Sequence, residues 1–223
     1  MAVSWFGTGT LLGSTGADIT PTLPASTAAN DILICMAASR DVTETCLTPS
    51  GWTLKSGPTD NTAWRVYVFY KRAAGGDANP LLDWSAAVGE KYGQVHAVRG
   101  AITSGDPFAA AALTVDLTDP IVSTGVTTTA ANQYVMAVGI GSDNASASVT
   151  VTATDPATWT QRHYSTIMTG ADAAGSFHDQ VRATAGATGN VTNDHNSTMP
   201  AMGVFVAAVT EAVLVAQFSM LLE

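Results

Sequence analysis

Charged residues are scarce in this sequence. They make up 12% of its 223 residues, and the 18 acidic residues outnumber the 9 basic ones, which gives a net charge of -9. An acidic surface with few basic side chains repels the phosphate backbone of nucleic acids and the headgroups of anionic lipids. We therefore expect no nucleic acid and no membrane among its partners. Low charge with many small residues is common in proteins that assemble over wide surfaces and in secreted domains, so composition leaves both classes open.

Cysteines and long apolar runs are also few. Cys35 lies in an apolar run and Cys46 in a polar loop, with no CxxC pair and no histidines at zinc spacing, so we expect two unpaired thiols. No stretch reaches the roughly 18 apolar residues of a membrane-spanning helix, which predicts a soluble protein. The opening MAVSWFGTGT has neither a basic region nor an apolar run, so we expect no secretory signal.

The usual motifs of enzymes and metal sites are missing from the sequence. It has no GxSxG, no HExxH and no P-loop. His178 precedes Asp179, but neighbours on a strand point to opposite faces, so this pair does not converge. The loops SDNAS (142–146) and DLTD (116–119) offer oxygen ligands for calcium, although strand corners use the same residues. We expect a non-enzymatic protein without metal or cofactor, in which the four histidines line the sandwich or lie at the surface: His96, His163, His178 and His195.

What the sequence does contain is a succession of short strands separated by clusters of Gly, Pro, Asn, Asp and Thr. This pattern predicts an all-β fold, an antiparallel, jelly-roll-like β-sandwich that forms a single domain over residues 1–209. In QYVMAVGIG (133–141) the larger residues alternate onto one face, which we expect to be core. In WRVYVFYK (64–71) large residues occupy both faces, so that strand is either covered on both sides or shows Tyr67 and Phe69 to a partner.

An internal repeat is the most informative pattern in the chain. Four pairs of segments match in the same order, namely 26–41 with 128–143, 49–53 with 156–160, 70–76 with 180–186, and 92–98 with 202–208. The first pair carries TAAN before an apolar strand in both copies. We therefore expect two repeated halves, at about 26–100 and 128–209, with Asn30 and Asn132 at the turn that leads into each core strand.

The repeat also bears on two tryptophans. Trp52 in PSGWT and Trp159 in PATWT occupy the same place in the two halves, which indicates a structural role. We expect both indoles to be core residues that fill the end of the sandwich, each burying roughly 150 to 250 Å². A sugar-stacking platform is the alternative, and it would require both indoles to be exposed at one rim.

Several of these segments together resemble a known group of proteins. PSGWTLKSG, WRVYVFYKRAAG, QVHAVRGAITSGDPF and the second TAAN strand are similar to the β-sandwich modules of tailed-bacteriophage virion proteins, over roughly residues 26–209. The resemblance implies a non-enzymatic virion component that is assembled in the host cytoplasm. It also implies partners, namely further copies of the chain in a trimer or dimer and other virion proteins such as the major capsid or tail proteins.

Two functions from different classes fit this resemblance. The first is a capsid decoration (cement) protein or head-fibre component that acts through protein–protein assembly. The second is a tail-associated, receptor-binding adhesin that recognises a host glycan. An adhesin at a distal tip is expected to carry long aromatic loops and a preceding shaft, whereas this chain enters its first strand at about Ser4. We therefore expect the first function.

The last segment, TEAVLVAQFSMLLE (210–223), has no counterpart after the first half. Read as a helix or as a strand, it presents one apolar face. Left in water, each large side chain would cost about 1.5 to 3 kcal/mol relative to burial. The segment either folds back to close the sandwich or contacts a neighbouring subunit. We expect the second, an assembly arm whose contacts come from Leu214, Phe218, Leu221 and Leu222.

Overall fold

A computed structural model describes residues 2–16, 18–142, 150–153, 158–168, 172–195 and 201–212. These residues form strands and loops without a helix, so the described part of the chain holds no helix that could cross a membrane. In chain order the strands are β1 (Ser4–Thr8), β2 (Leu12–Thr15), β3 (Ile32–Ser39), β4 (Thr53–Asp60), β5 (Arg65–Arg72), β6 (Glu90–Arg99), β7 (Phe108–Asp116), β8 (Ile121–Ser123), β9 (Thr127–Thr128), β10 (Gln133–Ser142), β11 (Thr150–Ala153), β12 (Thr160–Ile167), β13 (Ala173–Arg182), β14 (Gly186–Ala187), β15 (Val191–Asp194) and β16 (Ala201–Val209).

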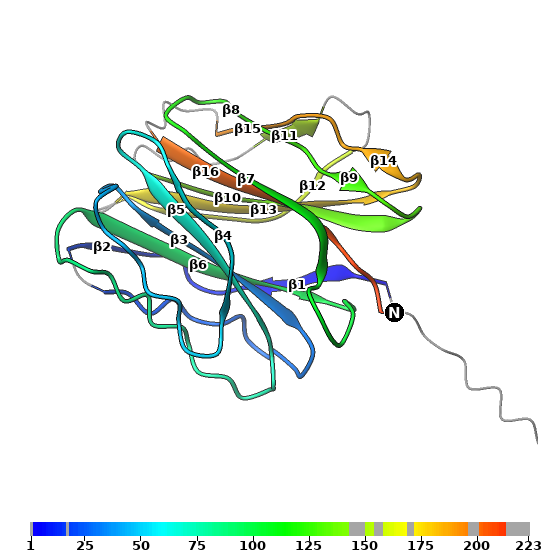
Figure 1. Ribbon diagram of the computed structural model, residues 1–223, viewed down its shortest axis with the longest axis horizontal. Helices are drawn as coiled ribbons and strands as arrows, with labels where there is room; N and C mark the ends of the chain where they lie inside the picture. The colour runs from blue at the N-terminus through cyan, green and yellow to red at the C-terminus, as the bar shows by residue number, and fades with distance from the viewer. Residues whose placement is uncertain are drawn as a thin grey trace, which may run out of the picture.

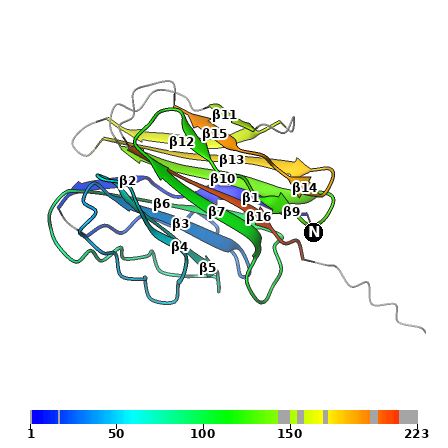
Figure 2. The ribbon, with the colours of Figure 1, turned by 45° about the horizontal axis from the view of Figure 1, so that its top comes forward.

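The strands build an antiparallel β-sandwich, as the sequence predicts. One large sheet has the order β1-β6-β3-β5-β4, with β2 also paired to β6, and the other has the order β12-β13-β10-β16-β7. The two sheets lie face to face (Figure 1), and the central core between them draws side chains from both. A small sheet of order β11-β15-β8 lies over the outer face of the second large sheet (Figure 2), and β9 pairs with β14.

The two large sheets have the same plan. In each, the strand that follows the TAAN turn is central, the next two strands that join the same sheet (β4 and β5, or β12 and β13) lie on one side, and the last strand of the half lies on the other. An early strand, β1 in one sheet and β7 in the other, completes the edge beside that last strand. The two sheets thus correspond strand by strand, and this correspondence includes β1 and β7, which precede residues 26 and 128.

The arrangement differs from the sequence expectation in two respects. Each large sheet takes its strands from one half of the chain, whereas in a jelly roll the chain crosses repeatedly between the sheets. The described strands therefore do not follow jelly-roll order. The ladders also make Val98, paired with Ile32, the counterpart of Val209, paired with Tyr134. The sequence match set Val98 against Ala208, one residue away, because small apolar residues on both faces of these strands hide the correct register.

Central strands are buried on both faces, which explains their continuous hydrophobicity. In β3, Ile32, Ile34 and Met36 face the central core, while Leu33 and Cys35 face an outer cluster. Strand β10 is likewise buried throughout, so its core is not confined to the one face that the sequence predicted. In β5, Tyr67 and Phe69 are covered by that outer cluster, which decides between the two readings of WRVYVFYK: the strand is covered on both sides.

The two TAAN turns have the same backbone form. Asn30 has φ 72° and Asn132 has φ 58°, a left-handed conformation that asparagine tolerates better than most residues. Asn30 N–H donates to the Ala73 carbonyl at 2.9 Å, which ties the first turn to the end of β5. Both turns deliver the chain into a central strand, in agreement with the role expected for these asparagines.

Candidate functional site

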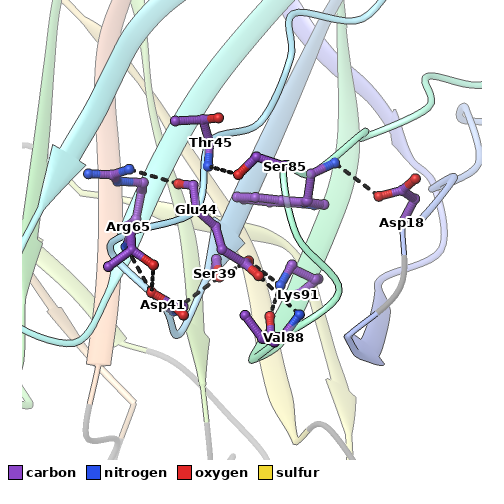
Figure 3. Close-up of polar contacts among 11 residues, drawn as sticks. Asp18, Ser39, Asp41, Glu44, Thr45, Arg65, Ser85, Val88 and Lys91 are labelled. Carbon is purple, nitrogen blue, oxygen red and sulfur yellow. Dashed lines mark hydrogen bonds and ion pairs between the residues drawn. The ribbon is translucent and has the colours of Figure 1, made fainter.

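A buried ion pair lies on the outer face of the first sheet. Lys91, at the start of β6, contacts the Glu44 carboxylate, and the two side chains are 0% and 1% exposed. Glu44 Oε1 accepts a hydrogen bond from Val88 N–H at 3.1 Å, and Glu44 Oε2 accepts one from the Ser39 hydroxyl at 3.1 Å. The Lys91 ammonium also donates to the Val88 carbonyl. Figure 3 shows these groups converging from β3, β6 and the two loops beside them.

Neighbouring polar contacts fasten the same two loops. Arg65 donates to the Glu44 carbonyl at 2.7 Å and forms a two-point ion pair with Asp60. Thr45 N–H donates to the Ser85 hydroxyl at 2.9 Å, which joins the loop after β3 to the loop before β6 (Figure 3). The indole of Trp84 lies 5.6 Å from Lys91 Nζ. Removing either partner alone would leave an isolated charge in an apolar cluster, so each residue of the pair needs the other.

A second polar group lies between the two large sheets. The Gln94 amide nitrogen, on β6, donates to the Ser165 hydroxyl at 2.9 Å and lies 3.3 Å from His163 Nε2, both on β12. The Gln94 side chain can reach across because the residue that it meets on β13 is Gly175. A Cβ at that position would overlap Gln94 Oε1. His96 Nδ1 lies 2.9 Å from the Thr8 hydroxyl. We call Gln94, His96, His163 and Ser165 the inter-sheet histidine group.

Burial controls the protonation of these histidines. Burial, and to a smaller extent the nearby His163, lower the pKa of His96 to about 3. Burial also lowers the pKa of His163. Both imidazoles are therefore neutral at pH 7, and protonating them would place two positive charges between the sheets. The arrangement makes the contact between the two halves sensitive to acid.

The adjacent pair His178 and Asp179 divides between two environments, as the alternation of a strand requires. Asp179 accepts hydrogen bonds from Arg162 Nε at 2.9 Å and from the Tyr134 hydroxyl at 2.7 Å. Burial, and then the Asp179 charge, raise the pKa of Tyr134. His178 is buried on the opposite face of β13. The pair therefore forms no acid–base couple.

The calcium hypothesis concerned two acidic loops. In DLTD, Asp116 accepts a hydrogen bond from Leu117 N–H, and Asp119 accepts one from His195 N–H at 3.1 Å, so both carboxylates support loop backbone. Most of SDNAS lies outside the described residues. Within the ranges that the structure describes, no three His, Cys, Asp or Glu side chains form a group suited to a metal ion.

The two repeat tryptophans lie in outer clusters rather than in the central core. Trp52 is 7% exposed and packs in the apolar cluster outside the first sheet. Trp159 is half-buried against the cluster outside the second sheet. Neither fills the end of the sandwich between the sheets. Trp64 belongs to the central core between the sheets, where it is fully buried and lies 5.4 Å from the ring of Tyr92.

The cysteines are free thiols in the structure, Cys35 fully buried and Cys46 nearly so. Burial raises the pKa of Cys46 to about 12, and it raises that of Cys35 as well. Thiols in this state are poor nucleophiles at neutral pH, because the reactive form is the thiolate.

A pocket of about 390 Å³ opens where β6 ends. Its wall consists of the first TAAN turn, the residues that follow β6, and Ala212: Ala28, Ala29, Asn30, Asp31, Arg99, Gly100, Ala101, Thr103 and Ala212. Arg99 Nε and Nη2 each donate to a different Asp31 carboxylate oxygen at 2.7 Å. The guanidinium lies 3.7 Å from the centre of the Phe6 ring. We call this the Asp31–Arg99 pocket, and its remaining lining is largely small and apolar.

The start of the C-terminal segment passes beside this pocket. Ile102 N–H donates to the Thr210 carbonyl, and Ala212 N–H donates to the Gly100 carbonyl, both at 3.0 Å. Residues 210–212 thus pair antiparallel with residues 100–102, around the bridge between Ala101 and Glu211. The arm residues named from the sequence, Leu214, Phe218, Leu221 and Leu222, lie outside the described residues.

Sequence reasoning missed both the buried pair and the pocket. Lys91 carried a signal, because it stands on a face of β6 that continues with Gly93, Val95 and Ala97. A lysine aligned with buried residues needs a buried anion. The pocket had no such signal, since its residues come from three separate parts of the chain.

No family model, curated protein or solved structure matches this chain.

Proposed function

We propose that this protein is a non-enzymatic structural subunit of a large assembly, a capsid decoration (cement) or head-fibre component of a tailed-bacteriophage virion. It acts by binding further copies of itself and other virion proteins. The resemblance of its strand segments to virion β-sandwich modules and its low content of charged residues support this function. Its residence is then the virion, assembled in the host cytoplasm.

The observation that carries the proposal is the place where the chain enters its apolar C-terminal segment. Ala212 lines the Asp31–Arg99 pocket, and VLVAQFSMLL follows it in the sequence. A sandwich with few charged residues, an apolar pocket and an apolar C-terminal sequence has the features of proteins that associate through exposed apolar patches. The segment supplies large side chains, and a pocket of this kind supplies the surface that would bury them.

The buried ion pair and the histidine group support the same function in a different way. Lys91 and Glu44 fasten loops to the first sheet, and Gln94 joins the two sheets. These contacts tie the loops and the two sheets of the sandwich to one another. A preformed surface loses less conformational entropy on association.

The test is the association state of the full-length chain, measured by sedimentation over a range of concentrations. We expect oligomers that weaken by about tenfold or more when Phe218→Asp or Leu222→Asp places a charge on the apolar face. Ser219→Asp is the matched control. It should leave association nearly unchanged, because Ser219 lies off the apolar face that contains Phe218 and Leu222. Association unaffected by both Phe218→Asp and Leu222→Asp contradicts the proposal.

The alternative function, a glycan-binding adhesin, is tested by a separate binding and activity measurement. Binding of the full-length chain to a host glycan, or release of oligosaccharides from bacterial surface polysaccharide, would overturn the structural assignment. A structural subunit gives neither signal and is retained on purified particles, where labelled protein is seen at the capsid by electron microscopy.

A further inference from the structure

We propose that the Asp31–Arg99 pocket is the receptor for the apolar arm, residues 213–223, of a second copy of the chain. This inference rests on the proposed function, which it extends by naming the surface that receives the arm and the copy from which the arm comes.

The pocket wall is held by contacts of its own. Ala28 N–H donates to Asp31 Oδ2 at 2.8 Å, and Asp31 is in turn held by Arg99. Asn30 and Asp31 are tied to Ala73 through backbone hydrogen bonds of 2.9 and 2.8 Å. The Asp31 side chain is only 2% exposed, so its charge is committed to the wall. A guest side chain therefore enters a cavity that is already formed, and binding does not have to order the surface.

Size and chemistry of the pocket fit apolar side chains. Its volume of about 390 Å³ lies in the range of pockets that enclose small organic groups. The alanines at positions 28, 29, 101 and 212 leave space that larger residues would fill. The arm offers Leu214, Phe218 and Leu222, which are guests of matching character. Burial of one such side chain is enough to strengthen association by roughly tenfold or more.

The arm of the same chain is the less suitable guest. Ala212 is itself part of the wall, so the chain would have to turn back after it to bring Phe218 or Leu222, six and ten residues farther on, into the same pocket. The stretch VLVAQF that follows contains no Gly, Pro, Asn or Asp, the residues that make tight turns. A neighbouring copy approaches without such a turn. Two copies that each place an arm in the other's pocket form a closed, twofold exchange.

The second half of the chain provides a matched comparison surface. Its TAAN turn has Gln133 in the place of Asp31, and the ladder register puts Thr210 in the place of Arg99. The Arg–Asp wall is thus specific to the first half. Ala29 and Ala131 occupy the same position in the two turns, and both are exposed. A bulky residue at Ala29 closes the pocket, whereas the same residue at Ala131 lies on the turn without that wall.

The experiment measures self-association of the full-length chain by sedimentation equilibrium for wild type, Ala29→Trp and Ala131→Trp. We expect Ala29→Trp to weaken association by about tenfold or more and Ala131→Trp to change it by less than about twofold. Thermal unfolding followed by circular dichroism shows whether each variant is folded. Thr103→Trp, at a second lining position from another part of the chain, repeats the test independently. Association of folded Ala29→Trp and Thr103→Trp at wild-type strength overturns the inference.

A cross-linking experiment identifies which copy supplies the arm. One batch of protein carries Thr103→Cys and another carries Ser219→Cys, and the native thiols do not interfere because both are buried. We expect mixing under mild oxidation to give a disulfide between the two batches. If the double variant Thr103→Cys/Ser219→Cys closes only within one chain, then the pocket binds its own arm and the inference is wrong. If neither preparation cross-links, the pocket does not bind the arm.

The two proposals fail in different ways. Loss of association in Phe218→Asp together with full association in Ala29→Trp retains the structural function and removes this pocket as its receptor. A wild-type chain that stays monomeric at every concentration removes both.

Discussion

The two halves of this protein reach one strand order with different coverings. The outer face of the first sheet lies under loops whose apolar cluster includes Trp52, Trp84 and Leu82, with the Glu44–Lys91 pair beside it. The outer face of the second sheet lies under the small sheet β11-β15-β8 and an apolar cluster that includes Met202. The ladder register makes Met202 the counterpart of Lys91, because each lies opposite the corresponding residue of its central strand, Gly141 or Ser39.

This difference shows what determines the plan of each half. The central strands are buried on both faces and set the strand pairing. The equivalent ladder position can therefore hold a charged residue, Lys91, in one sheet and an apolar residue, Met202, in the other. The buried lysine needs a carboxylate from a neighbouring loop, and Glu44 supplies it. The buried methionine needs only apolar neighbours. Exchanging the residues at these two positions is therefore the most direct test of the difference between the halves.

The largest expected effect is that of Lys91→Met, which gives the first half the residue of the second. It leaves the Glu44 carboxylate buried without its cation, and we expect a loss of about 3 to 5 kcal/mol in the free energy of unfolding. The double variant Lys91→Met/Glu44→Leu should recover most of that loss, since apolar pairs often replace buried ion pairs at little cost. Chemical denaturation at pH 7 measures all three proteins.

The reciprocal change, Met202→Lys, is the control for this prediction. It places an ammonium among the apolar side chains of the outer cluster of the second half, and we expect a comparable loss. If Lys91→Met is as stable as wild type, Glu44 does not need its buried cation. The charged and the apolar residue are then interchangeable at this ladder position.

An intermediate effect is expected from acid. The pKa of His96 is lowered to about 3 in the folded protein, whereas an unfolded histidine titrates near pH 6.5. Between these values the unfolded chain binds the extra proton, so stability is full above about pH 6.5 and falls as the pH drops below it. His96 alone then removes about 1.4 kcal/mol per pH unit, or about 2 kcal/mol by pH 5.

The counterpart of His96 in the second half is Ala207, which sharpens this prediction into a comparison. His96→Leu removes one titrating group from the contact between the sheets and should flatten the dependence of unfolding free energy on pH between about 5 and 7. His163 and His195, whose pKa values are also lowered, keep part of the slope. An unchanged slope in His96→Leu would mean that His96 is not buried in its neutral form.

Much of the fold follows from the sequence. Alternating apolar runs and turn residues predict the antiparallel sandwich, and the repeated TAAN predicts the two asparagine turns, which the structure has at Asn30 and Asn132. Register and topology do not follow, since strands buried on both faces carry no alternation to fix them. The repeat matched Trp52 with Trp159, but it could not tell whether they pack between the sheets or outside them. Both lie in outer clusters, and Trp64 is the tryptophan of the central core.

The site was less accessible to sequence reasoning. The Asp31–Arg99 pair joins the residue before β3 to the last residue of β6, and only the pairing of Ile32 with Val98 brings them together. Glu44 stands in a polar loop that reads as solvent-exposed, and its burial depends on how that loop lies against β6. Both are consequences of register, the property that the sequence determines least clearly here.

The smallest expected effect comes from Arg40, which pairs with Glu90 at 3.1 Å close to the buried pair. Both pairs connect the loop after β3 to the start of β6, but the Arg40 and Glu90 side chains are 38% and 27% exposed. Water already solvates these charges, so Arg40→Gln should cost about 0.5 kcal/mol or less, and added salt should remove the difference. Glu90 keeps a hydrogen bond from the Tyr92 hydroxyl at 2.6 Å, so the variant leaves its carboxylate with a partner. Chemical denaturation of wild type and Arg40→Gln at low and high salt checks the value. A cost near that of Lys91→Met would show that the position of a link between loop and strand, and not its burial, sets the energy of both pairs.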